Sequence, residues 1–357
     1  QSQTAFGEFD RSLFSQTVAE PNPQRTISEW STGFDLAWEV DVWGRYRRSI
    51  DSAEADLQAT IGDYDAVLLS LIADVASAYV DYRTTEARLE FAKNNIKIQE
   101  NSLRLTQTKA DTGASSYTGV YLARSSLEST RASVPSLEIE LRQSANQLCV
   151  LLGIPPQRLD ELLGSGSIPA VPAQVAVGIP ANLLRRRPDV RAAEWSIVAQ
   201  NEQIGIAEAD LYPSFTLTGE IALESEDFGD LFQSASSAGF IGPGFQWNVL
   251  NYGRLQNNVL LQEYAVRELV ENYRNTILVA NQEVEDALIA FLKTEERLRN
   301  LRASVDATSE ALRLLTISYE EGEIDFGNVF LLQGSLVTAQ DRLAEARGDV
   351  VLNLIDL

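Results

Sequence analysis

A tandem repeat constrains this chain more than any other feature of its sequence. Residues 33–148 align without a gap with residues 242–357, an offset of 209. The first matching pairs are Trp38/Trp247, Val40/Val249, Gly44/Gly253 and Arg45/Arg254, and later pairs include Tyr64/Tyr273, Glu86/Glu295, Arg88/Arg297, Leu103/Leu312 and Gly113/Gly322. Because a repeat sets the architecture on which every motif sits, the chain is predicted to be one structural unit built twice.

Four segments of about ten residues alternate apolar and polar side chains, which is typical of strands. They are residues 4–14, 34–42, 213–223 and 239–249, of which the first is the least regular. They form two hairpins, joined through residues 17–27 and 224–236. Such strands fit a soluble sheet as well as a membrane barrel. Four strands are too few to close a barrel, which needs about eight, so a barrel would require several chains.

An apolar repeat of seven residues follows the second strand of each hairpin and predicts long coiled-coil helices. The first helix is expected over residues 44–110, with a turn at 111–117 and a return helix at 119–152 that bends at Pro135. The second long helix is expected to turn at 320–325 and return over 327–357. Gly113 and Gly322 lie where a left-handed helix cap is expected.

Composition excludes several classes of function. The 357 residues carry a net charge of −22, with no histidine and one cysteine. Histidine-based triads, histidine-ligated metals and disulfides are therefore excluded, and we expect no cofactor and no metal site. Cys149 lies in an apolar run and is expected to be buried. The acidic chain lacks the basic face that nucleic acids require, since Arg185, Arg186 and Arg187 form only a short cluster.

No apolar run reaches the roughly 20 residues that a membrane-spanning helix needs. The sequence starts at Gln1 and contains no methionine and no signal peptide, so we expect a processed or trimmed chain.

The centre of the chain carries a recognisable motif. Residues 183–194 read LLRRRPDVRAAE, and IGIAEA and LYPSF follow at 204–209 and 211–215. Together with WEVDVWGR at 38–45, these residues resemble the TolC-like outer-membrane factor family, in its efflux-lipoprotein, NodT-like branch. The resemblance covers nearly the whole chain.

This resemblance implies a mixed α and β membrane protein of the bacterial outer membrane. Three chains would form one twelve-stranded β-barrel, four strands from each, continued by a hollow α-helical barrel in the periplasm. The implied division is a first hairpin at 1–43, a first helix pair at 44–153, an irregular equatorial segment at 154–187, a short helix at 188–210, a second hairpin at 211–249 and a second helix pair at 250–357. Lipidation is implied for the precursor, at a residue outside this sequence.

The implied function is the exit duct of a tripartite efflux or type I secretion system. Its partners would be two further copies of the chain, outer-membrane lipid, a periplasmic adaptor and an inner-membrane pump of the resistance-nodulation-division or ABC type. The helix tips would hold the gate and the adaptor contacts. We expect the adaptor at Gly113, Ala114, Gly322 and Glu323, and we expect Trp38, Trp43 and Trp247 at the membrane interface.

The second tip carries four carboxylates in seven residues, which three chains would turn into a negative ring. The gate hypothesis comprises Tyr319, Glu320, Glu321, Glu323, Asp325 and Asn328. Related channels carry aspartates where this chain has Asn328 and Leu331, so Glu323 and Asp325 would replace them, with Tyr319 as a bridging hydroxyl. The alternative is that the carboxylates form an ordinary solvated turn.

Two other classes of protein compete with a channel. A soluble coiled-coil scaffold or interaction protein would explain the heptads but leaves the alternating strands without a role. An enzyme using carboxylates alone, such as a glycosidase, would need paired acids in a cleft. We therefore predict a channel that is not an enzyme.

Overall fold

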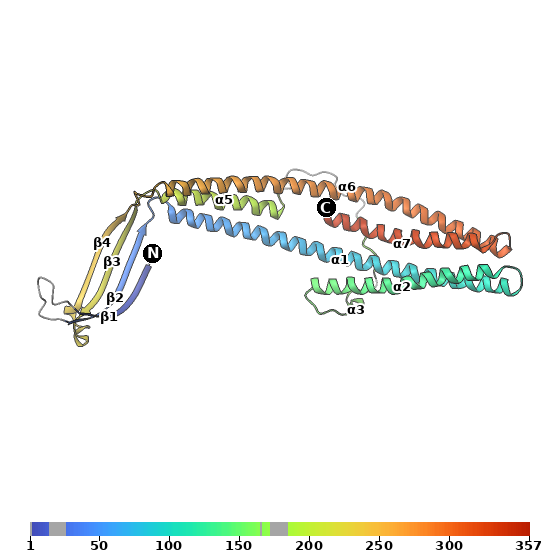
Figure 1. Cartoon of the computed structure of the whole chain (residues 1–357), viewed down its shortest axis with the longest axis horizontal. Helices are drawn as coiled ribbons and strands as arrows, with labels where there is room; N and C mark the ends of the chain where they lie inside the picture. Colours follow the sequence, from blue (N-terminus) through green and yellow to red (C-terminus); the bar gives the residue numbers. More distant parts are fainter. Residues whose placement is uncertain (1, 14–25, 165, 172–184) are drawn as a thin grey trace. The chain divides into compact units, whose positions relative to one another are not determined.

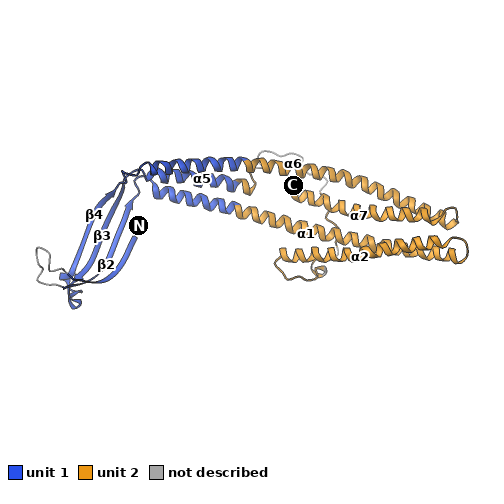
Figure 2. Cartoon of the chain, in the orientation of Figure 1, with its two compact units in different colours: residues 1–62, 191–274 blue, residues 63–190, 275–357 orange. Residues whose placement is uncertain are grey.

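The computed structural model describes residues 2–13, 26–164, 166–171 and 185–357. The chain divides into two compact units, one formed by Gln1–Gly62 and Arg191–Arg274, the other by Asp63–Val190 and Asn275–Leu357 (Figure 2). The two long helices each contribute to both units. In the described part of the chain, no helix is both long enough and apolar enough to cross a membrane.

The first unit contains one antiparallel sheet of four strands in the order β1-β2-β3-β4 (Figure 1). The strands are β1 (Ser2–Leu13), β2 (Thr26–Val40), β3 (Ser214–Ser225) and β4 (Ser237–Gln246). Two short 3-10 helices, Phe228–Asp230 and Ser234–Ser236, connect β3 to β4. The two predicted hairpins are therefore confirmed, and pairing of β2 with β3 joins them.

Two strand boundaries differ from the prediction by three residues or more. β2 begins eight residues before the alternating segment at 34–42, because residues 26–33 continue the register with β1. β4 ends at Gln246, so the expectation of a strand through Val249 was wrong. The chain turns after Gln246 towards Gly253, whose φ of 80° permits the change of direction into the next helix.

The strand register places the apolar side chains on one face of the sheet. Phe34 pairs with Ile221, Trp38 with Leu217, and Phe215 with Phe245. Most of this face is open: Phe34, Ile221 and Phe245 are 69%, 74% and 73% exposed in the single chain. The sheet therefore presents an uncovered apolar surface.

Helix α5 (Pro188–Ala209) packs between the first turns of α1 (Arg45–Asp111) and α6 (Arg254–Glu321). Gln203 donates to Ser52 of α1 at 2.8 Å, and Gln200 donates to Gln262 of α6 at 2.6 Å. α5 begins at Pro188, as predicted, because proline suits the first helical position.

The second unit contains the remainder of the long helices and the return helices α2 (Tyr117–Leu151) and α7 (Phe326–Asp356), with the short α3 (Asp160–Leu163). α2 is one helix that includes Pro135. The predicted heptads form the core: Val305, Leu312 and Tyr319 of α6 pack with Val329, Leu336 and Leu343 of α7. Cys149 is fully buried, as expected.

Candidate functional site at the helix tips and the strand-to-helix junction

Both helix tips end in the same backbone motif. At the first tip, Gly113 N donates to Ala110 O at 3.0 Å and Ala114 N donates to Lys109 O at 2.8 Å. At the second, Gly322 N donates to Tyr319 O at 3.1 Å and Glu323 N donates to Ser318 O at 2.9 Å. These are Schellman caps, and the φ values of 73° for Gly113 and 84° for Gly322 require the left-handed conformation. The predicted glycine caps are confirmed.

The side chains of the two tips differ. At the first tip, Tyr117 Oη and Gln107 Nε2 each donate to Asp111 Oδ1 at 2.8 Å. This hydrogen bond from the hydroxyl to Asp111 raises the pKa of Tyr117. At the second tip, the residue equivalent to Tyr117 is Phe326, which is buried against the Tyr319 ring at 5.4 Å. The first tip is thus closed by an exposed polar network, and the second by an aromatic pair.

Tyr319 does not occupy the position that a bridging hydroxyl in a gate would need. Its side chain is 3% exposed, and its buried hydroxyl has no hydrogen-bond partner in the described part of the chain. By contrast, the carboxylates of the second tip are exposed, and none makes an ion pair with another described residue. They are Glu320, Glu321, Glu323 and Asp325, and the neighbouring Asn328 is also exposed.

Lys109 connects the two tips. Its Nζ donates to the carbonyl oxygens of Tyr319 and Glu320, both at 2.8 Å, and lies 5.0 Å from the Tyr319 ring centroid. A cation at the C-terminus of α6 is favourable because the last carbonyls of a helix carry partial negative charge. One signal for this residue was present in the sequence, a lone cation in the last turn of α1, but nothing there identified α6 as its partner.

Two buried or half-buried arginines of α1 were also missed. Arg83, 2% exposed, donates to the carbonyl oxygens of Leu163 and Gly164 at 2.8 and 3.0 Å and so holds the equatorial segment on α1. Arg88 forms ion pairs with Glu140 of α2 and with Asp341 and Glu345 of α7. The repeat alignment contains Arg88, but it does not show these partners.

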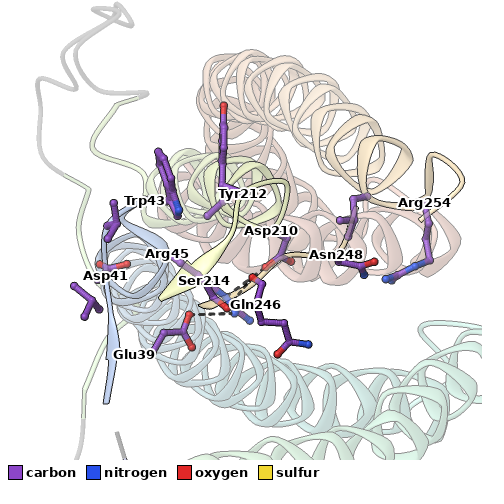
Figure 3. A pocket seen from close by; sticks show the side chains of 14 residues that line it. Glu39, Asp41, Trp43, Arg45, Asp210, Tyr212, Ser214, Gln246, Asn248 and Arg254 are labelled. Atoms are coloured by element: carbon purple, nitrogen blue, oxygen red, sulfur yellow. Dashed lines mark hydrogen bonds and ion pairs between the residues drawn. The ribbon is translucent and has the colours of Figure 1, made fainter. Parts of the chain in front are cut away.

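The strand-to-helix junctions of both repeats line one polar pocket of about 260 Å³ (Figure 3). Arg45 lies between two carboxylates, 3.9 Å from Glu39 and 3.6 Å from Asp210. Asp41 accepts the N–H groups of Tyr46 and Arg47, both at 3.1 Å, and so caps α1. Desolvation raises the pKa of Asp41, but these hydrogen bonds and the Arg47 charge outweigh it, and the pKa is lowered overall.

The aromatic residues predicted for the membrane interface lie at this junction or on the sheet. The indole N–H groups of Trp43 and Trp247 donate to Pro213 O at 2.8 Å and Leu211 O at 3.0 Å. Trp43 also stacks on Tyr212 at 4.5 Å. Trp38 lies on the apolar face of the sheet and is 41% exposed. All three rings are therefore partly exposed at the end of the sheet that leads into the helices.

Among the described residues, no group of three or more potential ligands is arranged to hold a metal ion. A family model for outer membrane efflux proteins matches residues 4–154 and 179–357, which is most of the chain. The chain belongs to the outer membrane efflux protein family. The resemblance predicted from residues 183–215 is thereby confirmed.

Relatives and solved structures agree with this assignment. Nodulation protein T of Rhizobium leguminosarum bv. viciae is 35% identical over 321 residues, 88% of this chain and 66% of that protein. The toluene efflux pump outer membrane protein TtgF of Pseudomonas putida is 31% identical, over 91% of this chain and 68% of that protein. The chain thus spans about two thirds of the length of these relatives.

The outer-membrane channel OprN has a TM-score of 0.92 and 29% identity, with 99% of this chain and 80% of that chain covered. A crystal structure of CusC has a TM-score of 0.86 and 26% identity, with coverage of 100% and 82%. This efflux protein therefore has the fold of outer-membrane channels. Its outer-membrane location and efflux role, both predicted from the sequence, are confirmed, and the soluble scaffold is set aside.

Proposed function

We propose that three copies of this chain form the exit duct of a tripartite efflux or type I secretion system. Each copy gives four strands to one twelve-stranded barrel, and its helices continue the barrel into the periplasm. The sheet carries this proposal: β1 and β4 are its two edges among the described strands, and its apolar face is uncovered. Backbone groups at a strand edge need partners in a bilayer, and neighbouring chains supply them when the barrel closes.

The opposite face of the sheet suits a water-filled lumen. It carries Asp35 directly across from Glu220, and Ser31 lies between Glu8 and Glu224 in neighbouring strands. Like charges that face each other across strands are unfavourable unless water screens them. A lumen lined by these carboxylates would favour cations.

The helices provide a second reason for a trimer. In the first repeat, Asn95 and Gln99 of α1 and Ser126 of α2 are buried, and Gln340 of α7 accepts a hydrogen bond from Asn95 at 2.8 Å. The equivalent groove between α6 and α7, lined by residues that include Ser304, Thr308 and Ser335, has an open volume of about 530 Å³. In the first repeat, α7 of the second repeat packs on the groove. By the same geometry, α2 from the first repeat of the next copy would occupy the groove between α6 and α7.

The gate in this proposal is the second tip. Glu320, Glu321, Glu323 and Asp325 from three chains would form an acidic ring, with Asn328 on the next helical turn. We leave Tyr319 out of the ring because its hydroxyl is buried in the hairpin core. Tyr319 instead helps to position the ring, since its carbonyl oxygen binds Lys109 of the first tip.

The partners in this proposal are a periplasmic adaptor and an inner-membrane pump of the resistance-nodulation-division or ABC type. The adaptor would bind Gly113, Ala114, Gly322 and Glu323, where a side chain added at either glycine meets nothing within 4 Å. One relative is named a toluene efflux pump protein and another a cation efflux system protein. The acidic lumen and tip favour positively charged cargo, and the role is transport rather than catalysis.

Two measurements on protein extracted in mild detergent test the duct. Native mass spectrometry should give a trimer that dissociates only on heating, and planar bilayers should show cation-selective steps. A stable monomer that does not conduct would refute the proposal.

A further inference from the structure

A cavity of about 420 Å³ lies in the second unit, and its lining shares no residue with the helix tips. Its walls come from α6, α7 and the equatorial residues 168–171. Ten residues line it: Ile168, Pro169, Ala170, Val171, Glu295, Leu298, Arg302, Arg347, Val350 and Val351. The duct proposed above uses none of them.

Two arginines line this cavity, the exposed Arg302 of α6 and the half-buried Arg347 of α7. Neither Arg302 nor Arg347 forms an ion pair with any described residue, although Glu295 lines the same cavity. Burial, and then the nearby positive charge of Arg302, lowers the pKa of Arg347. Neighbouring like charges repel each other, and an anion bound near both would relieve the repulsion.

Arg347 also carries an unsatisfied donor. Its Nε is buried and has no hydrogen-bond partner among the described residues. A buried N–H of a guanidinium without an acceptor is costly, whereas the planar fork of donors on arginine matches a carboxylate well. None of the described residues supplies an acceptor for this donor, so it is open to a bound carboxylate.

The chain has 51 acidic and 29 basic residues, so carboxylates are plentiful partners for its arginines. Arg88, Arg131 and Arg187 each bind at least two carboxylates. In the first repeat, the positions equivalent to Arg302 and Arg347 hold Lys93 and Glu138, which have opposite charges. The segment 172–184, which follows the cavity wall in sequence, contains no aspartate or glutamate. It therefore has no carboxylate to offer.

Apart from Glu295, the remaining walls are apolar. Leu298, Val350 and Val351 line the cavity from the helices, and Ile168 and Val171 line it from the equatorial segment. Apolar walls with a few placed polar groups are typical of sites for small organic ligands. An inorganic ion would use the arginines but not these walls.

We propose that this cavity binds a small organic carboxylate, with the carboxylate between Arg302 and Arg347 and the apolar body against Leu298, Val350 and Val351. The site is formed by one chain and does not depend on the duct.

Binding of 4-fluorobenzoate to the purified full chain, followed by fluorine NMR, tests this site. The Arg347→Gln variant should bind about tenfold more weakly or worse, because it removes charge-assisted hydrogen bonds. Arg302→Gln should weaken binding in the same direction. The matched control is Arg342→Gln, an exposed arginine of α7 outside the cavity, which should bind like the parent.

Neutral 4-fluorobenzamide and inorganic phosphate distinguish the ligand classes. The amide should not compete with 4-fluorobenzoate, and phosphate should compete at least tenfold less well than benzoate. Equal binding by the parent and both arginine variants would overturn the proposal, as would equal competition by the amide or tighter binding of phosphate. If Arg347→Gln does not fold, Arg302→Gln and Arg347→Lys decide the question.

Discussion

Arg88 of α1 donates two hydrogen bonds to Asp341 of α7, from Nε to Oδ1 at 2.7 Å and from Nη2 to Oδ2 at 3.1 Å. It is the first of four polar residues of α1 at intervals of seven, the others being Asn95, Ser102 and Lys109, which bind Gln340, Gln333 and the end of α6. In a coiled coil this spacing keeps all four on one face. The equivalent positions on α6 are Arg297, Ser304, Ala311 and Ser318, so this row of contacts is not repeated.

We expect Arg88→Ala to cost about 2 kcal/mol in the free energy of unfolding, because it leaves three carboxylates without their cation. The matched variant is Arg297→Ala, which removes an exposed pair with Asp349 at 3.2 Å and should cost under about 1 kcal/mol. Urea unfolding in detergent, followed by far-UV circular dichroism, measures both. Equal costs would show that the three carboxylates around Arg88 stabilise the fold no more than one exposed ion pair does.

Lys109→Met should loosen the second tip, because two carbonyl oxygens of α6 lose their donor. Hydrogen exchange at residues 319–323 should accelerate by about tenfold, which corresponds to about 1.4 kcal/mol of lost local protection. Lys97→Met, an exposed change on the same helix, should leave exchange there unaltered. Unchanged exchange in Lys109→Met would mean that the lysine does not hold the tip.

Neutralising the acidic tip with Glu320→Gln, Glu321→Gln, Glu323→Gln and Asp325→Asn together should reduce cation selectivity several-fold, because the ring potential falls with its charge. Reversal potentials in planar bilayers measure this. The control swaps each acid for the other, Glu to Asp and Asp to Glu, and should retain selectivity. If the neutral tip is as selective as the parent, the carboxylates form only a solvated turn.

The adaptor contact is best probed without straining the caps. Gly113→Asn and Gly322→Asn add a side chain into open space, and asparagine tolerates the left-handed conformation. We expect this double variant, and Ala114→Trp, to lose most adaptor crosslinking while the trimer persists. Glu138→Trp on the exposed face of α2 is the control. Intact crosslinking in both tip variants would place the adaptor elsewhere.

The cap of α1 should depend on pH. Because the folded pKa of Asp41 is lowered, its stabilisation is fully present above the unfolded value of about 3.9 and is lost as the pH falls through the folded pKa. The difference in melting temperature between the parent and Asp41→Ala should therefore be constant near neutrality and shrink in acid. If the difference at pH 2.5 is as large as at neutral pH, the cap does not depend on the charge of Asp41.

Some features of the fold could be predicted from the sequence. The 209-residue offset, the heptads and the glycines at the tips depend on short-range chemistry, because periodicity decides which face is buried and only glycine takes φ near 80° without strain. The same is true of Pro188 at the start of α5. The candidate carboxylates and their exposure followed from a polar turn between two apolar heptads.

The ends of β2 and β4 depended on partners. Residues 26–33 of β2 lack clean alternation and become a strand because β1 lies beside them. Trp247 follows β4 rather than ending it, and its indole donates to Leu211. Local propensity carries no information about such long-range pairing.

The sequence by itself determined the repeat, the helices and the family, because these are written in periodic patterns and local motifs. Only the tertiary structure decided which side chains of one repeat contact the other repeat. In the tertiary structure Tyr319 is buried, Lys109 binds carbonyl oxygens of another helix, and Arg302 and Arg347 line the same cavity. The physical reason is that the charge and burial of a side chain depend on residues about 200 positions away, which periodicity cannot identify.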